Sequence, residues 1–62
     1  MAWVATDANG QETIFEFEPE RKQDLFWVEY IGDFLYLPKG SIKKLIGRDL
    51  TWQDEPIELK DE

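Results

Sequence analysis

The sequence contains no cysteine and no histidine. Without cysteine the chain has no disulfide and no thiolate for redox or nucleophilic chemistry. Without either residue, zinc sites of the usual Cys/His type are excluded. The only serine, Ser41, is accounted for by a role in helix capping. These absences predict a protein that is not an enzyme, with no catalytic residue, no metal site and no cofactor.

Long hydrophobic runs are also absent. No apolar stretch approaches the about 20 residues that a transmembrane helix needs. The opening residues MAWVATDANG have no basic region ahead of an apolar segment, as a signal peptide would. We therefore expect a cytoplasmic protein that does not bind membranes.

The chain has 62 residues, which predicts a single small domain over residues 1–62. A core of this size supplies only about 3–5 kcal/mol unless disulfides, a metal or association add to it. With disulfides and zinc excluded, the remaining means are association with another chain and dense aromatic packing. The aromatic residues are Trp3, Phe15, Phe17, Phe26, Trp27, Tyr30, Phe34, Tyr36 and Trp52.

The charge is negative overall but divided by segment. The net charge is −7, which favours solubility and opposes contact with polyanions. Residues 1–38 hold eight acids against Arg21 and Lys22, and residues 49–62 hold six acids against Lys60. Between them, the segment LPKGSIKKLIGR has four basic residues and no acid. This asymmetry is the main electrostatic feature of the sequence.

Short runs of β-forming residues alternate with turn signals. Asn9-Gly10 favours a hairpin, either with a two-residue turn or with a three-residue loop that has Gly10 in a bulge. The connection at 19–24 is polar. Alternation and β-formers predict strands at 2–6, 12–18, 25–31, 34–38, 50–52 and 57–59.

The predicted strands at 25–31 and 34–38 are apolar on both faces, as in strands covered on both sides. A chain this short has little material to cover two faces. Three arrangements satisfy the pattern: the sheet curls into a small barrel, a helix covers one face, or a partner does.

A short helix is predicted over Ser41–Ile46. Ser41 is a capping residue, Gly47 is a natural stop, and Ile42, Leu45 and Ile46 share one helical face. A helix this short has no independent stability, so that face must dock on the sheet.

The predicted fold class is therefore mainly β (α+β): a small antiparallel sheet or SH3-like curled barrel of about five short strands, with one short helix near 41–46. The predicted core comprises Trp3, Phe15, Phe17, Trp27, Leu35, Leu37, Ile42, Leu45, Ile46 and Trp52.

Two classes of function remain. The first is a non-enzymatic protein-interaction module, for which a self-associating accessory protein of a phage or mobile element is one form. It rests on the doubly apolar strands and the many aromatic residues. The second is a nucleic-acid-associated protein, which either binds through residues 39–48 or uses its acidic surface to mimic nucleic acid. The strong negative charge disfavours nucleic-acid binding.

The candidate partner-binding residues are of two kinds. The basic ones lie in or beside the predicted helix, where Lys43 and Lys44 fall in the first turn and oppose the helix dipole unless acids of the sheet offset them. The aromatic ones lie on the doubly apolar strands. The set is Lys39, Lys43, Lys44, Arg48, Phe26, Tyr30 and Tyr36, and the partner is an unidentified protein or a second copy.

Two motifs carry a resemblance. The segment WVATDANGQE fits W-V-A-x-D-x-x-G-x-E, and LPKGSI follows later. In these features the chain resembles a family of short uncharacterised proteins from bacterial and phage genomes, over most of its length. The resemblance implies no activity, ligand or catalytic residue. The succession of strand, short helix and strand is similar in topology to small SH3-like barrels.

Overall fold

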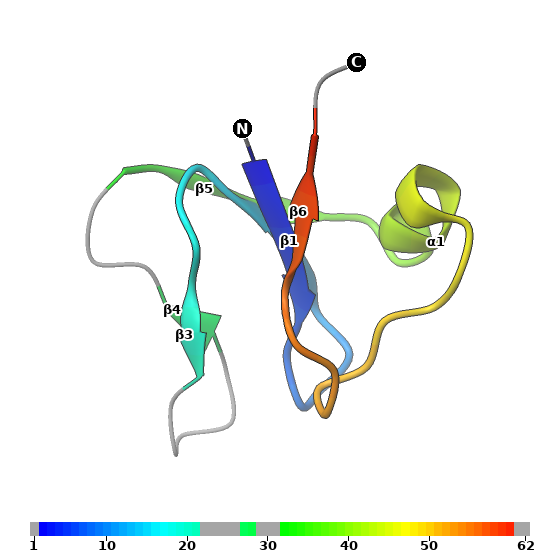
Figure 1. Cartoon of the computed structure of the whole chain (residues 1–62). Coiled ribbons are helices and arrows are strands. Elements are labelled where there is room, and N and C mark those ends of the chain that lie inside the picture. The colour runs from blue at the N-terminus through cyan, green and yellow to red at the C-terminus, as the bar shows by residue number, and fades with distance from the viewer. Residues whose placement is uncertain (1, 22–26, 29–31, 61–62) are drawn as a thin grey trace.

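The computed structural model describes residues 2–21, 27–28 and 32–60. These residues form a four-stranded antiparallel sheet in the order β5-β2-β1-β6, a two-stranded ladder β3-β4 and one helix (Figure 1). The mainly β class with one short helix is confirmed. The elements are β1 (Ala2–Thr6), β2 (Glu12–Phe15), β3 (Glu20–Arg21), β4 (Trp27–Val28), β5 (Phe34–Leu37), α1 (Ser41–Ile46) and β6 (Ile57–Leu59). Among the described residues, no helix is long and apolar enough to cross a membrane.

The β1–β2 hairpin uses the three-residue loop. The Asp7 N–H donates to Gln11 O at 2.9 Å, and the Gly10 N–H donates to Asp7 O at 2.9 Å. Gly10 has φ +90°, as the bulge position of such a loop requires. This turn sets the register in which Trp3 lies opposite Phe15.

The register divides the apolar residues of the sheet between two faces. On one face, Val4 lies beside Ile14 and Ile57. These pack with Ile42 of α1 and with Leu50, so we call this the helix face. Helix α1 has its one buried residue, Ile42, in this cluster.

On the other face, Ala5 and Phe15 pack with Trp27 of β4, and Trp3 and Trp52 border the cluster. We call this the tryptophan face. Both faces of the main sheet thus carry a cluster supplied by the chain itself. A helix covers one face, which is one of the predicted arrangements, and the β3–β4 ladder covers the other.

The position of the β3–β4 ladder depends on a change of register between the two ladders. From Phe15 in β2 to Glu20 in β3 the chain advances five positions, whereas from Val28 in β4 to Phe34 in β5 it advances six, although Phe15 pairs with Phe34 and Glu20 pairs with Val28. An extra residue on one strand bends a ladder, as in a β-bulge. Gly32 lies on the longer side with φ +81°. The strand predicted over 12–18 is therefore interrupted, and β3 forms inside the segment predicted as a polar connection.

The region predicted as a strand at 50–52 is a turn, so that prediction is wrong. The Asp54 carboxylate accepts the Thr51 N–H at 2.8 Å, and the Asp54 N–H donates to Thr51 O at 3.0 Å. Leu50 joins the cluster of the helix face, whereas Trp52 borders that of the tryptophan face. The segment therefore passes from one side of the sheet to the other, which a paired strand would not allow.

Three residues of the predicted core are exposed instead. Phe17 is 47% exposed, Leu35 69% and Leu45 54%. Phe17 follows the end of β2, where the period of two no longer applies. Leu35 lies on an edge strand, and α1 is too short to bury more than Ile42 completely. Among the described residues, the predicted core also lacked three buried hydrophobic ones: Val4, Ala5 and Leu50.

Gly32 provides the first prediction. A Cβ at this position would lie 2.6 Å from Phe17 Cδ2 and 2.7 Å from the Glu16 carboxylate, in addition to the strain of a positive φ. We expect Gly32→Ala to destabilise the protein by about 2–4 kcal/mol, measured by urea unfolding monitored by tryptophan fluorescence.

Gly10→Ala is the matched control, because Gly10 has a similar φ and nothing within 4 Å of its added Cβ. Gly10→Ala should lower the free energy of unfolding by only about 1–2 kcal/mol, the cost of holding alanine at a positive φ. Equal losses in the two variants would show that the close approach at Gly32 does not matter.

Candidate protein-interaction surface

Strand β5 exposes apolar side chains on both faces of the sheet. Phe34 is 49% exposed and Tyr36 67% exposed on the tryptophan face, and Leu35 is 69% exposed on the helix face. Among the described strands, β5 is an edge of the main sheet, with β2 as its neighbour there. We call Phe34, Leu35 and Tyr36, with the main chain of this edge, the β5 surface.

The backbone of β5 also has an open side. The Glu16 N–H donates to Asp33 O at 2.9 Å, so Asp33 bonds toward β2. In an antiparallel ladder, alternate residues point their N–H and C=O groups to the same neighbour. Leu35 and Leu37 therefore also bond toward β2, while the polar backbone groups of Phe34 and Tyr36 point to the open edge.

The aromatic side chains of this surface stack on one another and on the core. The Phe34 ring lies 6.1 Å from the ring of buried Phe15, and the Tyr36 ring packs edge-on against Phe34 at 5.4 Å. Such contacts hold exposed rings in one orientation. The β5 surface is therefore an ordered extension of the tryptophan face.

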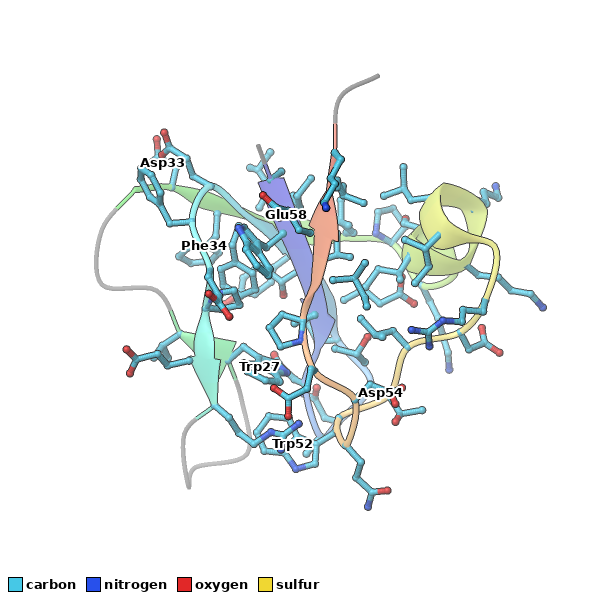
Figure 2. All side chains as sticks on the ribbon, in the orientation of Figure 1. Trp27, Asp33, Phe34, Trp52, Asp54 and Glu58 are labelled. Atoms are coloured by element: carbon cyan, nitrogen blue, oxygen red, sulfur yellow. The ribbon has the colours of Figure 1, made fainter. Side chains whose placement is uncertain are left out.

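The two ends of β5 differ in charge. Its first end follows Asp33, and the Glu16 carboxylate accepts the Asp33 N–H there at 2.9 Å. Its last end leads through Pro38 to exposed Lys39 and α1. Figure 2 shows Asp33 and Phe34 on the side of the molecule opposite α1. The strand thus runs from an acidic end to a basic end.

The basic segment remains exposed at Lys39, Lys43, Lys44 and Arg48. Lys43 and Lys44 belong to the last turn of the six-residue helix, where positive charge is favourable. Because the helix has only six residues, Lys43 and Lys44 also lie in its first turn, as predicted. Arg48 donates weakly to Asp49 O, at 3.4 Å.

Glu12 supplies the acid at the other end of the helix. From β2, its carboxylate accepts the N–H groups of Gly40 and Ile42, each at 2.8 Å. The sequence predicted that Ser41 would accept such a bond, but the Ser41 hydroxyl donates to Pro38 O at 2.6 Å. Gly40 is the capping residue, so a distant acid replaces the side chain that normally caps a helix.

A second polar arrangement joins the β3–β4 ladder to residues 52–54. The Arg21 guanidinium lies 4.8 Å from the Trp27 ring and 5.0 Å from the Trp52 ring. It also donates to Trp52 O at 2.8 Å and to Asp54 O at 3.0 Å. Figure 2 shows Trp27 and Trp52 close together at one end of the sheet. Arg21 is therefore occupied in holding the fold.

Two aspartates have shifted pKa values. The N–H of Thr51 lowers the pKa of Asp54 most, and the charges of Arg48 and Arg21 lower it further. Burial raises the pKa of Asp7, although its bond from the Trp27 N–H acts in the opposite direction. The Asp54 carboxylate stabilises the turn at 51–54, whereas the Asp7 carboxylate holds the backbone of Trp27 in β4. Neither belongs to the β5 surface.

Of the predicted aromatic site residues, Tyr36 lies on the β5 surface. Phe26 and Tyr30 lie outside the described residues. Sequence reasoning did not select Phe34, Leu35 or Asp33, because strand order determines which apolar strand becomes an edge. It also missed Glu12, whose partners lie 28 and 30 positions away along the chain.

Known proteins add no identification to this geometry. No family model, no curated protein and no solved structure matches the chain. Within the described part of the chain, no group of three or more acidic, cysteine or histidine side chains is placed to hold a metal ion.

The capping role of Glu12 provides the second prediction. In Glu12→Gln one acceptor oxygen becomes an NH₂ group that faces a backbone N–H. We expect a loss of about 1–2 kcal/mol in the free energy of unfolding, measured in urea. Glu16→Gln is the control, because Glu16 accepts a single exposed N–H and glutamine retains one acceptor. A loss in Glu12→Gln no larger than in the control would contradict the capping role.

The raised pKa of Asp7 provides the third prediction. Its pKa in the folded state lies above the ordinary value of 3.8, so folding favours the neutral acid. This contribution to stability is full below pH 3.8 and is lost as the pH rises through the folded pKa.

Asp7→Asn keeps an oxygen that accepts the Trp27 N–H and has no charge. We therefore expect the variant to gain stability relative to the wild type as the pH rises from about 3 to 7. Urea unfolding across that range measures the difference. Asp7→Ala, which removes the acceptor, should be less stable than Asp7→Asn throughout. A difference between Asp7→Asn and wild type that does not change with pH would contradict the assignment.

Proposed function

We propose that this chain is a non-enzymatic protein-interaction module that binds its partner through the β5 surface. The observation that carries the proposal is that three parts of one strand, β5, are exposed. Side chains on both faces of β5 and the backbone along its edge are all open to a partner.

This combination supports binding by strand addition. An added strand pairs with the open N–H and C=O groups, while exposed side chains on either side provide selectivity. Exposed edge strands promote association with other chains, so natural proteins usually protect them with charge, proline or a covering segment. On β5, protection begins only at Pro38 and Lys39, after the apolar residues have ended.

Strand β6, at the other edge of the main sheet, exposes less apolar surface to a partner. All three residues of β6 are half-buried, and Glu58 places a charge in the middle of the strand. Pro56 precedes the strand and lacks a backbone donor. The contrast between the two edges favours β5 as the binding edge.

The test is a comparison of two charge variants of similarly exposed leucines. Leu35→Glu places a charge on the β5 surface, and Leu45→Glu places one on α1. Tagged wild type, Leu35→Glu and Leu45→Glu proteins are used to capture proteins from a lysate of the source organism. We expect a partner that wild type and Leu45→Glu retain and Leu35→Glu loses by at least about tenfold.

Copies of this chain are identified by mass spectrometry and excluded from the comparison. Circular dichroism establishes that both variants fold. A partner retained equally by Leu35→Glu, or no partner other than the chain itself, would overturn binding through β5 to another protein. Oligonucleotide retention at low salt, lost in Lys43→Glu/Lys44→Glu, would instead favour the nucleic-acid alternative.

A further inference from the structure

We infer that a second copy of this chain can occupy the β5 surface, through antiparallel pairing of β5 with the partner's β5 around a two-fold axis at Leu35. This inference rests on the proposed use of β5 as the binding surface, and it specifies an occupant. Three separate features of the surface are complementary to themselves.

The backbone is the first. A two-fold axis at Leu35 sets Phe34 opposite the partner's Tyr36, and Tyr36 opposite the partner's Phe34. These are the residues whose N–H and C=O groups point to the open edge. Residues opposite one another in such a pair exchange two hydrogen bonds. The four open groups of each copy are therefore all satisfied, with four hydrogen bonds in total.

The side chains are the second feature. Residues opposite each other in a ladder lie on the same face of the sheet. Phe34 then meets the partner's Tyr36 on the tryptophan face, and Leu35 meets the partner's Leu35 on the helix face. Aromatic pairs of this kind are favourable across strands. The three most exposed apolar residues of β5 all become covered by apolar neighbours.

Charge is the third feature. Antiparallel pairing sets the basic end of one β5 beside the acidic end of the other. Asp33 then lies opposite the partner's Leu37, and the partner's Lys39 follows two positions later, in the turn beyond the end of its β5, from where its side chain can extend to Asp33. The symmetry produces this contact twice. These contacts oppose the general repulsion between two copies that each carry −7.

The arrangement closes on itself. Each copy uses the same surface, so the pair has two-fold symmetry and leaves no further β5 edge for a third copy. The two four-stranded sheets become one continuous sheet. Its two edges are the β6 strands, which are half-buried and carry the charge of Glu58.

The experiment uses opposite charges at the symmetry axis. Sedimentation equilibrium measures the mass of the wild type, Leu35→Glu, Leu35→Lys and an equimolar mixture of the two variants. We expect a dimer for the wild type. Each variant alone should be monomeric, because the axis sets two like charges opposite each other. The mixture should recover the dimer, since Glu then lies opposite Lys.

The control is the same series at Leu45, which is exposed on α1 and outside the proposed contact. Leu45→Glu and Leu45→Lys should dimerise like the wild type. A second series tests the ends of the strand. Lys39→Glu should weaken the dimer about tenfold, through two contacts of the strength of exposed ion pairs, and Asp33→Lys/Lys39→Glu should restore it.

A wild type that stays monomeric at about 1 mM would overturn the inference. So would a dimer that Leu35→Glu leaves intact, or a mixture of charged variants that remains monomeric. These results are independent of the capture comparison. A monomer that still loses a different captured protein in Leu35→Glu would end the second-copy inference and leave the proposed function standing.

Discussion

Trp27 connects the β3–β4 ladder to the main sheet through three kinds of contact. Its indole N–H donates to Thr6 O at 3.0 Å, its backbone N–H donates to the Asp7 carboxylate at 2.9 Å, and its ring packs against Phe15. A ladder with two residues in each strand has no stability of its own. Without Trp27, the hairpin would not cover the tryptophan face. Arg21 then uses the same ring to hold the turn before β6.

The packing of the β3–β4 ladder on the tryptophan face determines which apolar side chains stay exposed there. On the tryptophan face, Trp27 of the β3–β4 ladder and Trp52 pack around Ala5 of β1 and Phe15 of β2. Phe34 and Tyr36 lie at the β5 edge and keep about half or more of their surface exposed. On the helix face, α1 contacts the central residues and leaves Leu35 open. The β5 surface is what a chain of this length leaves uncovered on both sides of one strand.

Local patterns predicted much of the fold. The bounds of β1, α1 and β6 agree with the prediction, because turn residues mark their ends. The hairpin loop at Gly10 was one of two predicted forms. The strand over 12–18 was predicted too long, because β2 ends at Phe15 and the next pairing, from Glu20, has a different register. The candidate site was only partly predicted: Tyr36 was selected, whereas Phe34 and Leu35 were not.

The basic segment shows the same division. Its order of residues specified a strand end, a turn and a helix of six residues, since proline, glycine and apolar spacing act over a few positions. The acid that satisfies the start of that helix comes from Glu12, which register brings there from 28 positions away. Likewise, alternation marked β5 as apolar on both faces, but it could not say whether β5 would be central or an edge. That depends on strand order, which arises from contacts between residues far apart in the chain.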